Sequence, residues 1–95
     1  MYEILCLISS KIDKNQLEET INLVKNTLIQ DLKGEIVSEK ILGEKKLSYP
    51  IKKEKRGFYW LLYFNLSPQK VKKFEEKLKN IPEILRFLIV KKRKI

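Results

Sequence analysis

Residues 4–17 have the sequence ILCLISSKIDKNQL, which joins a short apolar strand to the start of a helix. The first five residues are all apolar, which is typical of a central strand with both faces covered. Asp13 is a good N-cap, and Gln16, three residues later, completes a capping box. Ile12 and Leu17 occupy the two positions of a hydrophobic staple. This stretch therefore predicts a β-α unit.

Both predicted helices have start and stop signals. The first carries an apolar stripe at spacings of three and four residues, formed by Leu17, Ile21, Val24, Leu28 and Leu32. Gly34 is its natural C′ stop. The second begins at Ser67 as N-cap with Pro68 at N1, and Pro82 marks its exit. Its apolar stripe consists of Val71, Phe74 and Leu78.

The other segments are rich in strand-forming residues. Gly43 interrupts the second strand and suggests a bulge, while Pro50 cannot lie within a central ladder. Residues 52–56 are expected to be a basic connector, and Gly57 opens the most aromatic segment. The predicted strands cover residues 1–9, 35–42 continued by 47–51, 58–66 and 84–90.

The order of these elements decides the fold class. Strand, helix, two strands, helix and strand in under 100 residues is the β-α-β-β-α-β order of ferredoxin-like domains. Right-handed crossovers place both helices on one face of the sheet. We therefore predict a single α+β domain over residues 1–95, with a four-stranded antiparallel sheet, two helices on one face and a basic tail at 91–95.

The composition excludes several kinds of chemistry. The chain has no His, which excludes His-based triads and His-ligated metal sites, and one Cys, which excludes an internal disulfide. Cys6 stands in an apolar run and is expected to be a buried core residue. The three glycines form no phosphate-binding loop. We therefore expect no enzymatic activity, no cofactor and no metal site, and the chain is expected to be soluble and unexported.

The charge is strongly basic and unevenly placed. The formal net charge is +9, yet residues 1–39 carry more acids than lysines, so the positive charge comes from residues 40–95. Such a balance favours a polyanionic partner, most often a nucleic acid. The asymmetry predicts a positive face built by the second half of the chain.

One sheet face remains bare in this architecture. Strand alternation assigns ten residues to the helix side: Ile4, Cys6, Ile8, Phe58, Trp60, Leu62, Phe64, Leu85, Phe87 and Ile89. The residues that remain on the bare face are still apolar and aromatic, and an exposed apolar patch usually marks a binding surface. Its candidate partner-binding residues are Leu5, Leu7, Tyr59, Leu61, Tyr63 and Leu88.

Two other functions compatible with this fold stay open at this point. Residues 56–63, RGFYWLLY, partly match the RNP1 pattern of RNA-recognition motifs, although Tyr59 stands where that pattern needs a small residue. Such a domain would stack single-stranded bases on the bare face. A regulatory domain that binds a small molecule is the other alternative, because ferredoxin-like folds host many functions.

The middle of the chain carries a more specific pattern. Residues 43–53, GEKKLSYPIKK, followed by Gly57 and an aromatic strand, resemble the signature of the family of the sixth protein of the bacterial small ribosomal subunit. Tyr2-Glu3-Ile4 and residues 84–91 resemble that family's first and last strands. The chain departs from the family at Ser48, which replaces the more usual Ala, and in the long C-terminal extension that some members carry after the last strand. The resemblance implies a non-enzymatic protein of bacterial cytoplasmic or plastid-type ribosomes. It also implies binding to the central domain of small-subunit RNA, on the platform, as a heterodimer with the eighteenth protein of that subunit.

A cluster of basic residues is the expected RNA-binding surface. Phosphates dominate affinity for folded RNA, and duplex RNA is recognised by shape and backbone. Tyr49 adds an aromatic group that can stack on a base or bind a phosphate. We expect one continuous strip along the connector, extended by the last strand and the tail. Its members are Lys45, Lys46, Tyr49, Lys52, Lys53, Lys55, Arg56, Arg86, Lys91, Lys92, Arg93 and Lys94.

Overall fold

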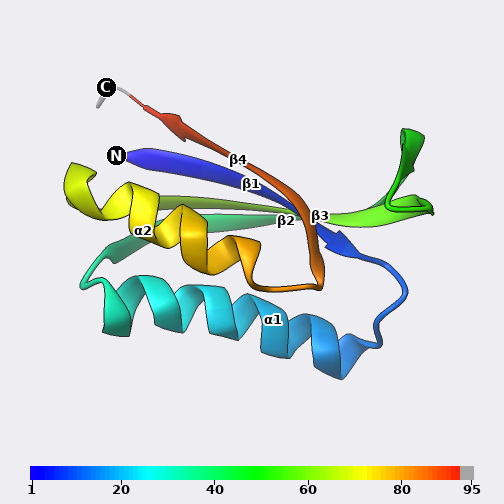
Figure 1. The fold of residues 1–95 in the computed structure, drawn as a ribbon, viewed down its shortest axis with the longest axis horizontal. Helices are drawn as coiled ribbons and strands as arrows, with labels where there is room; N and C mark the ends of the chain where they lie inside the picture. The colour runs from blue at the N-terminus through cyan, green and yellow to red at the C-terminus, as the bar shows by residue number, and fades with distance from the viewer. Residues whose placement is uncertain (93–95) are drawn as a thin grey trace.

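The element order agrees with the one predicted, in a computed structural model that describes residues 1–92. The elements are β1 (Tyr2–Ser9), α1 (Lys14–Asn26), the π-helical turn η1 (Thr27–Asp31), β2 (Glu35–Ile51), β3 (Glu54–Asn65), α2 (Pro68–Lys79) and β4 (Ile84–Lys91). The strands pair antiparallel in the order β2-β3-β1-β4. Both helices cover the same face of this sheet (Figure 1). The ferredoxin-like α+β fold is therefore confirmed.

The start of α1 follows the predicted capping box. The Asp13 carboxylate accepts the Gln16 N–H at 2.8 Å, and the Gln16 side-chain oxygen accepts the Asp13 N–H at 3.3 Å. These two bonds satisfy backbone donors that the first helical turn leaves without a partner. Val24 and Leu28 on its apolar stripe are fully buried against the sheet.

The end of this helix differs from the prediction. The helix widens into the π-helical turn η1. After it, Lys33 and not Gly34 takes the left-handed conformation, with φ 59°. The Gly34 N–H donates to the Leu28 carbonyl at 2.8 Å. Gly34 is needed for close approach, because a Cβ there would lie 2.9 Å from the Asn65 carbonyl oxygen.

The second helix begins where predicted, with Ser67 at N-cap and Pro68 at N1, but the Ser67 side chain makes no capping bond. Two of its lysines hold the end of η1. Lys70 Nζ donates to the Leu32 carbonyl at 2.9 Å, and Lys77 Nζ lies 3.9 Å from Asp31 Oδ2. A cation at a helix C-terminus complements the exposed carbonyls there.

The main core fills the space between the helices and the sheet. Its largest fully buried side chains are Trp60, Phe64 and Phe74, and Phe64 meets Phe74 edge to face with ring centroids 5.4 Å apart. Cys6 is buried in this core, as expected, and burial raises the pKa of its thiol to about 12. The thiol is therefore not a nucleophile at neutral pH.

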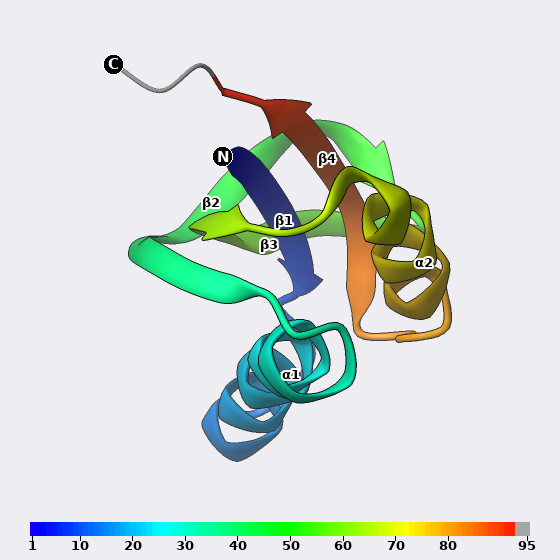
Figure 2. The same ribbon diagram turned by 90° about the vertical axis from the view of Figure 1, so that its left-hand side faces the viewer.

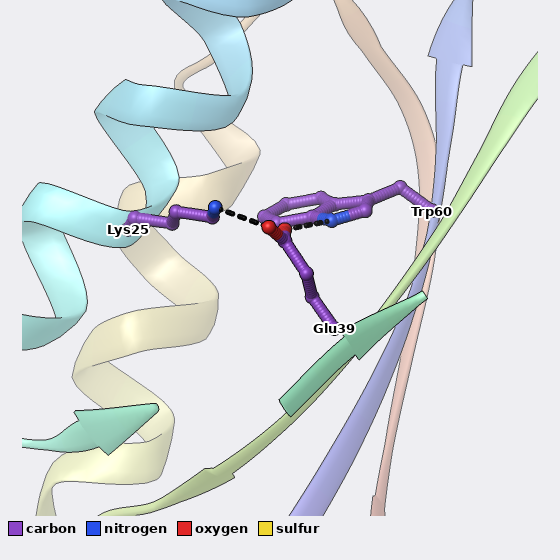
Figure 3. A network of polar contacts seen from close by, with 3 residues as sticks. All are labelled: Lys25, Glu39 and Trp60. Carbon is purple, nitrogen blue, oxygen red and sulfur yellow. Dashed lines mark hydrogen bonds and ion pairs between the residues drawn. The ribbon is translucent and has the colours of Figure 1, made fainter. Parts of the chain in front are cut away.

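A polar network closes the edge of this core (Figure 3). Trp60 Nε1 donates to Glu39 Oε2 at 2.8 Å, and Lys25 Nζ donates to Glu39 Oε1 at 2.6 Å. Burial opposes the charge on Glu39, but the hydrogen bonds from Lys25 and Trp60 outweigh it and lower the pKa of that carboxyl. The network joins α1, β2 and β3 and satisfies the indole N–H.

The second strand curves around the sheet. Gly43 has φ 88° and lies at a register shift opposite Tyr59, so the predicted bulge is confirmed. Pro50 lies on an edge strand, as its missing N–H requires. Figure 2 shows the later part of β2 passing over the bare face of the sheet toward β4.

This curvature creates a second, smaller core on the face that the helices leave open. Leu47 of β2 packs there on Leu7 and Leu85, with Ile51 and Tyr59 partly buried against them. Assigning Leu85 to the helix side was wrong. Leu7 pairs with Arg86 and Ile8 with Ile84, so Leu85 is an extra residue in a bulge and reaches the other face.

Candidate nucleic-acid interface

The end of β2 and the start of β3 form one hairpin, which we call the basic arm (residues 44–57). It extends past the end of β1 (Figure 1). Lys46 pairs with Arg56 and Ile51 with Glu54, so only Lys52 and Lys53 form the turn. The prediction that residues 52–56 form a connector is therefore wrong, because β3 already begins at Glu54.

The turn of the arm is unusual for its residue types. Lys52 and Lys53 have φ values of 49° and 67°, the left-handed region that a two-residue type I′ hairpin needs at both positions. Asn-Gly or Asp-Gly is the usual choice there, since other residues adopt this conformation at a cost. Two lysines give no sequence signal for such a turn, which is why it was not predicted.

The basic residues of the arm do not form one strip on one side. All are exposed, but side chains alternate along a strand, so the neighbours Lys45 and Lys46 project to opposite faces of the hairpin. Lys46 lies opposite Arg56, whose Nε is 3.6 Å from Glu44 Oε2. The positive charge therefore lies on both faces of a narrow arm and does not follow the one continuous strip that was expected.

Arg86 of β4 contacts the basic arm at Tyr49. Arg86 Nη1 donates to the Tyr49 hydroxyl at 3.1 Å. Both line a cleft of about 440 Å³ between the end of β2 and the open sheet face, shared with the predicted partner-binding residues Leu5, Leu7, Tyr59 and Leu88. The structure thus joins two predicted RNA-binding residues to the predicted partner surface.

A second hollow, of about 470 Å³, brings the tip of the arm close to β4. Lys52 and Arg86 both line it, as do Lys79 and Glu75 of α2. Lys79 was not among the predicted RNA-binding residues. Only the tertiary fold shows that Lys79 lies near Lys52 and Arg86. Nothing in the sequence distinguishes Lys79 from the other solvated lysines of that helix.

The C-terminal basic residues lie elsewhere. Lys91 pairs with Tyr2 at one end of β1, whereas Gly57 at the base of the arm pairs with Ser9 at the other end. Lys92 Nζ is 3.7 Å from Glu3 Oε2. Lys91 and Lys92 therefore do not extend the arm, contrary to expectation, and Arg93 and Lys94 fall outside the described residues.

The open face divides into a covered and a bare part. Leu7 was expected to be exposed but is only 4% exposed, because Leu47 covers it. Leu5, Leu61 and the ring of Tyr59 are half-buried, while Leu88 is 61% exposed. The bare part is thus centred on Leu5, Leu61 and Leu88.

Tyr63 lies at a polar end of this face, where it pairs with Glu3 across β1 and β3. Hydrogen bonding to the Glu3 carboxylate raises the pKa of the Tyr63 phenol, which favours its neutral, donating form. Lys92 approaches the same carboxylate. Tyr63 therefore forms the polar margin of the predicted partner surface.

Comparisons with known proteins agree with the fold and with the family that residues 43–53 resemble. The family model described as Ribosomal protein S6 matches residues 1–91. This chain belongs to the ribosomal protein S6 family. It is 36% identical over 90 residues to the small ribosomal subunit protein bS6 of Fusobacterium nucleatum, covering 95% of each chain. It is 34% identical to bS6 of Azobacteroides pseudotrichonymphae, covering 99% of this chain and 83% of that protein.

A solved structure supports the same membership. The crystal structure of 30S ribosomal protein S6 from Thermotoga maritima superposes with a TM-score of 0.90 at 27% identity, covering 96% of this chain and 85% of that one. As a member of the S6 family, the chain is a structural protein of the small ribosomal subunit, not an enzyme. Its bacterial relatives place it on the cytoplasmic ribosome.

The register of β3 removes the support for an RNA-recognition motif in this S6-family chain. In that motif the RNP1 aromatics must be free to stack on bases. Here Trp60 is fully buried under the helices, and Phe58 packs against the same core. Phe58 and Trp60 of this pattern thus belong to the main core and do not form a stacking platform on the open face.

The remaining surface offers few other sites. Within residues 1–92 no group of three or more Cys, Asp or Glu side chains is arranged to hold a metal ion. Nor is any helix in that range long and apolar enough to cross a membrane. The basic arm and the open face with its cleft are therefore the two candidate interfaces.

Proposed function

We propose that this S6-family protein binds the central domain of small-subunit ribosomal RNA through its basic arm. The observation that carries the proposal is the arm itself, on which six exposed basic residues gather within one hairpin: Lys45, Lys46, Lys52, Lys53, Lys55 and Arg56. We further propose that the open sheet face binds the eighteenth protein of the subunit, so that the two proteins bind RNA as a heterodimer on the platform.

The shape of the arm suits a folded RNA. Lys/Arg contacts to phosphates release counterions and supply most of the affinity. Charges on both faces of a narrow hairpin can contact phosphates on two sides at once, which a flat patch cannot do. Duplex RNA is recognised mainly through its shape and backbone, so the arm needs no base-specific contacts.

The open face suits a protein partner. Leu5, Leu61 and Leu88 form an apolar surface beside the cleft, whose rim carries the hydrogen-bonded pair Tyr49 and Arg86. An apolar centre with aromatic and Arg groups around it is the composition expected of a protein interface. Tyr49 and Arg86 are thereby proposed for the partner surface as well as for RNA.

The RNA proposal is tested by the salt dependence of binding. The double variant Lys45→Gln/Lys46→Gln should bind a central-domain RNA fragment more weakly and lower the slope of log K against log salt by about one for each phosphate that is no longer neutralised. Lys72→Gln/Lys73→Gln on the exposed face of α2 removes the same charge and is the control. Equal reductions in both variants would contradict a specific role for the arm.

The partner proposal is tested with Leu61→Asp. We expect this variant to keep a cooperative unfolding transition while losing co-purification with the eighteenth subunit protein. RNA binding by the isolated chain should change much less. A variant that still binds the partner with unchanged affinity would remove the open face from the interface.

A further inference from the structure

One acidic residue lies inside the basic arm and is not exposed. Glu54 follows the Lys52–Lys53 turn directly and is only 8% exposed. Its Oε1 accepts a 2.7 Å hydrogen bond from the Ser9 hydroxyl. Burying a carboxylate is costly unless it is hydrogen-bonded, so this contact is a specific structural feature and not an incidental one.

The Ser9–Glu54 hydrogen bond ties the tip of the arm to the end of a central strand. Ser9 is the last residue of β1, and its N–H donates to the Glu83 carbonyl at 2.8 Å. A second bond runs from the Ser10 hydroxyl to the Arg56 carbonyl at 3.2 Å. At Gly57, where β3 crosses Leu7, an added Cβ would collide with the Leu7 side chain. The arm therefore has a fixed base.

The tip needs this support. Two successive non-glycine residues with positive φ are strained and persist only where the surrounding structure holds them. Glu54 is the register partner of Ile51, so the pair closes the turn from both sides. In this position Lys52 shares a hollow with Arg86 of β4, which joins the tip to a basic residue far along the chain.

We propose that Glu54, through its hydrogen bond to Ser9, is a positioning residue for RNA binding. It carries the wrong charge to touch phosphate, yet it holds Lys52 and Lys53 where both contact the RNA backbone. The inference rests on the proposed RNA-binding function of the arm. Preorganised cations bind more tightly because less conformational entropy is lost on association.

The test is a substitution for which simple electrostatics and positioning by Glu54 predict opposite changes in RNA affinity. Glu54→Ala removes a negative charge, so electrostatics alone predicts tighter binding to a central-domain RNA fragment. Positioning predicts binding several-fold weaker, with a salt slope lowered by about one to two because the tip no longer reaches its phosphates. The matched control is Glu44→Ala, an exposed acid on the same arm, which should bind as tightly as the parent or tighter.

A second pair of variants changes no charge. Ser9→Ala should lower affinity and slope as Glu54→Ala does, and Ser9→Thr, which keeps the hydroxyl, should restore both. Hydrogen exchange should be faster at amides of the arm tip and unchanged in the main core, which separates loss of positioning from unfolding. Tighter binding by Glu54→Ala, or an unchanged salt slope in Ser9→Ala, would overturn the inference. If the lysine variants of the arm also had no effect, the proposed function itself would fail.

Discussion

The two faces of the same sheet are built in different ways. On the helix side, Ile4, Leu62 and Phe64 are fully buried in one continuous core. On the other side, apolar burial is confined to the end where β2 folds over Leu7, and Leu88 remains exposed. The difference shows that one face supplies most of the stability, which leaves the other free to carry apolar surface for binding.

Adjacent residues of β3 give the sharpest form of this comparison. Leu62→Ala on the helix side should lower the free energy of unfolding by about 3 kcal/mol, because it leaves a cavity in a closed core. Leu61→Ala on the open face should lower it by about 1 kcal/mol or less, since solvent already reaches that side chain. Chemical denaturation of both variants measures the difference, and equal decreases would mean that the open face is as closed as the core.

Truncation of a side chain in the covered part of the open face should lower the free energy of unfolding by an intermediate amount. Leu7→Ala removes the centre of the second cluster, and we expect a decrease of about 2 kcal/mol in unfolding free energy. The cluster packs Leu47 against the sheet, so hydrogen exchange of the β2 amides around Leu47 should also become faster. A decrease below about 0.5 kcal/mol, well under the usual cost of such a truncation, would show that β2 does not depend on this packing.

The polar network at the edge of the main core should have a smaller effect. Glu39→Gln weakens the interaction with Lys25 while keeping an acceptor for Trp60, so we expect a decrease of about 1 kcal/mol in unfolding free energy at about pH 7. Because the pKa of Glu39 is lower in the folded state, its contribution is present above the unfolded pKa and disappears as pH falls through the folded pKa.

The pH dependence provides the check on this network. The stability difference between the parent protein and Glu39→Gln should persist from about pH 7 to about pH 5 and shrink below about pH 4. Urea denaturation at each pH measures it. A difference that grows toward acid pH would contradict a lowered pKa of Glu39 in the folded state.

The smallest effect on stability is expected at Leu88. Leu88→Asp places a charge where the side chain is already mostly in solvent, so the unfolding free energy should change by no more than about 0.5 kcal/mol. Binding of the eighteenth subunit protein should nevertheless be strongly weakened. A large drop in stability with unchanged partner binding would assign Leu88 to the core instead.

The fold could be predicted well because most of its elements have start, stop or bulge signals in their own sequence. The Asp13–Gln16 box, Pro68 at N1 and the bulge at Gly43 depend on short-range chemistry, and the structure contains all three. The order of the elements then leaves few topologies. Strand alternation also assigned the helix-side residues of β1 and β3 correctly.

The errors arose where distant segments decide the local structure. Leu85 changes face because a bulge opposite Leu7 and Ile8 adds a residue to β4, and alternation along β4 alone cannot reveal it. Lys33 adopts the left-handed conformation in place of Gly34 because the last turn of the helix widens. Both depend on pairing or packing that no short window of sequence contains.

The candidate site was predictable in composition but not in arrangement. The clustering of lysines near residues 45–56 is visible in the sequence. Their division between two faces follows from the pairing of residues 44–46 with the start of β3. The contact between Tyr49 and Arg86 depends on the path of β2 over the sheet. Glu54 was overlooked because an acid among basic residues looks like ordinary surface, although its interruption of the charge run was the available signal.

The bend of β2 also hinders edge-to-edge pairing between two copies of the chain. An edge strand offers unpaired N–H and C=O groups to which a strand of another chain can add. Here the outer strand is bent at Gly43, contains Pro50 and turns its far end inward against Leu7. At this edge of the sheet a newly made copy thus presents no long straight strand for self-association, whereas β4 forms the opposite edge.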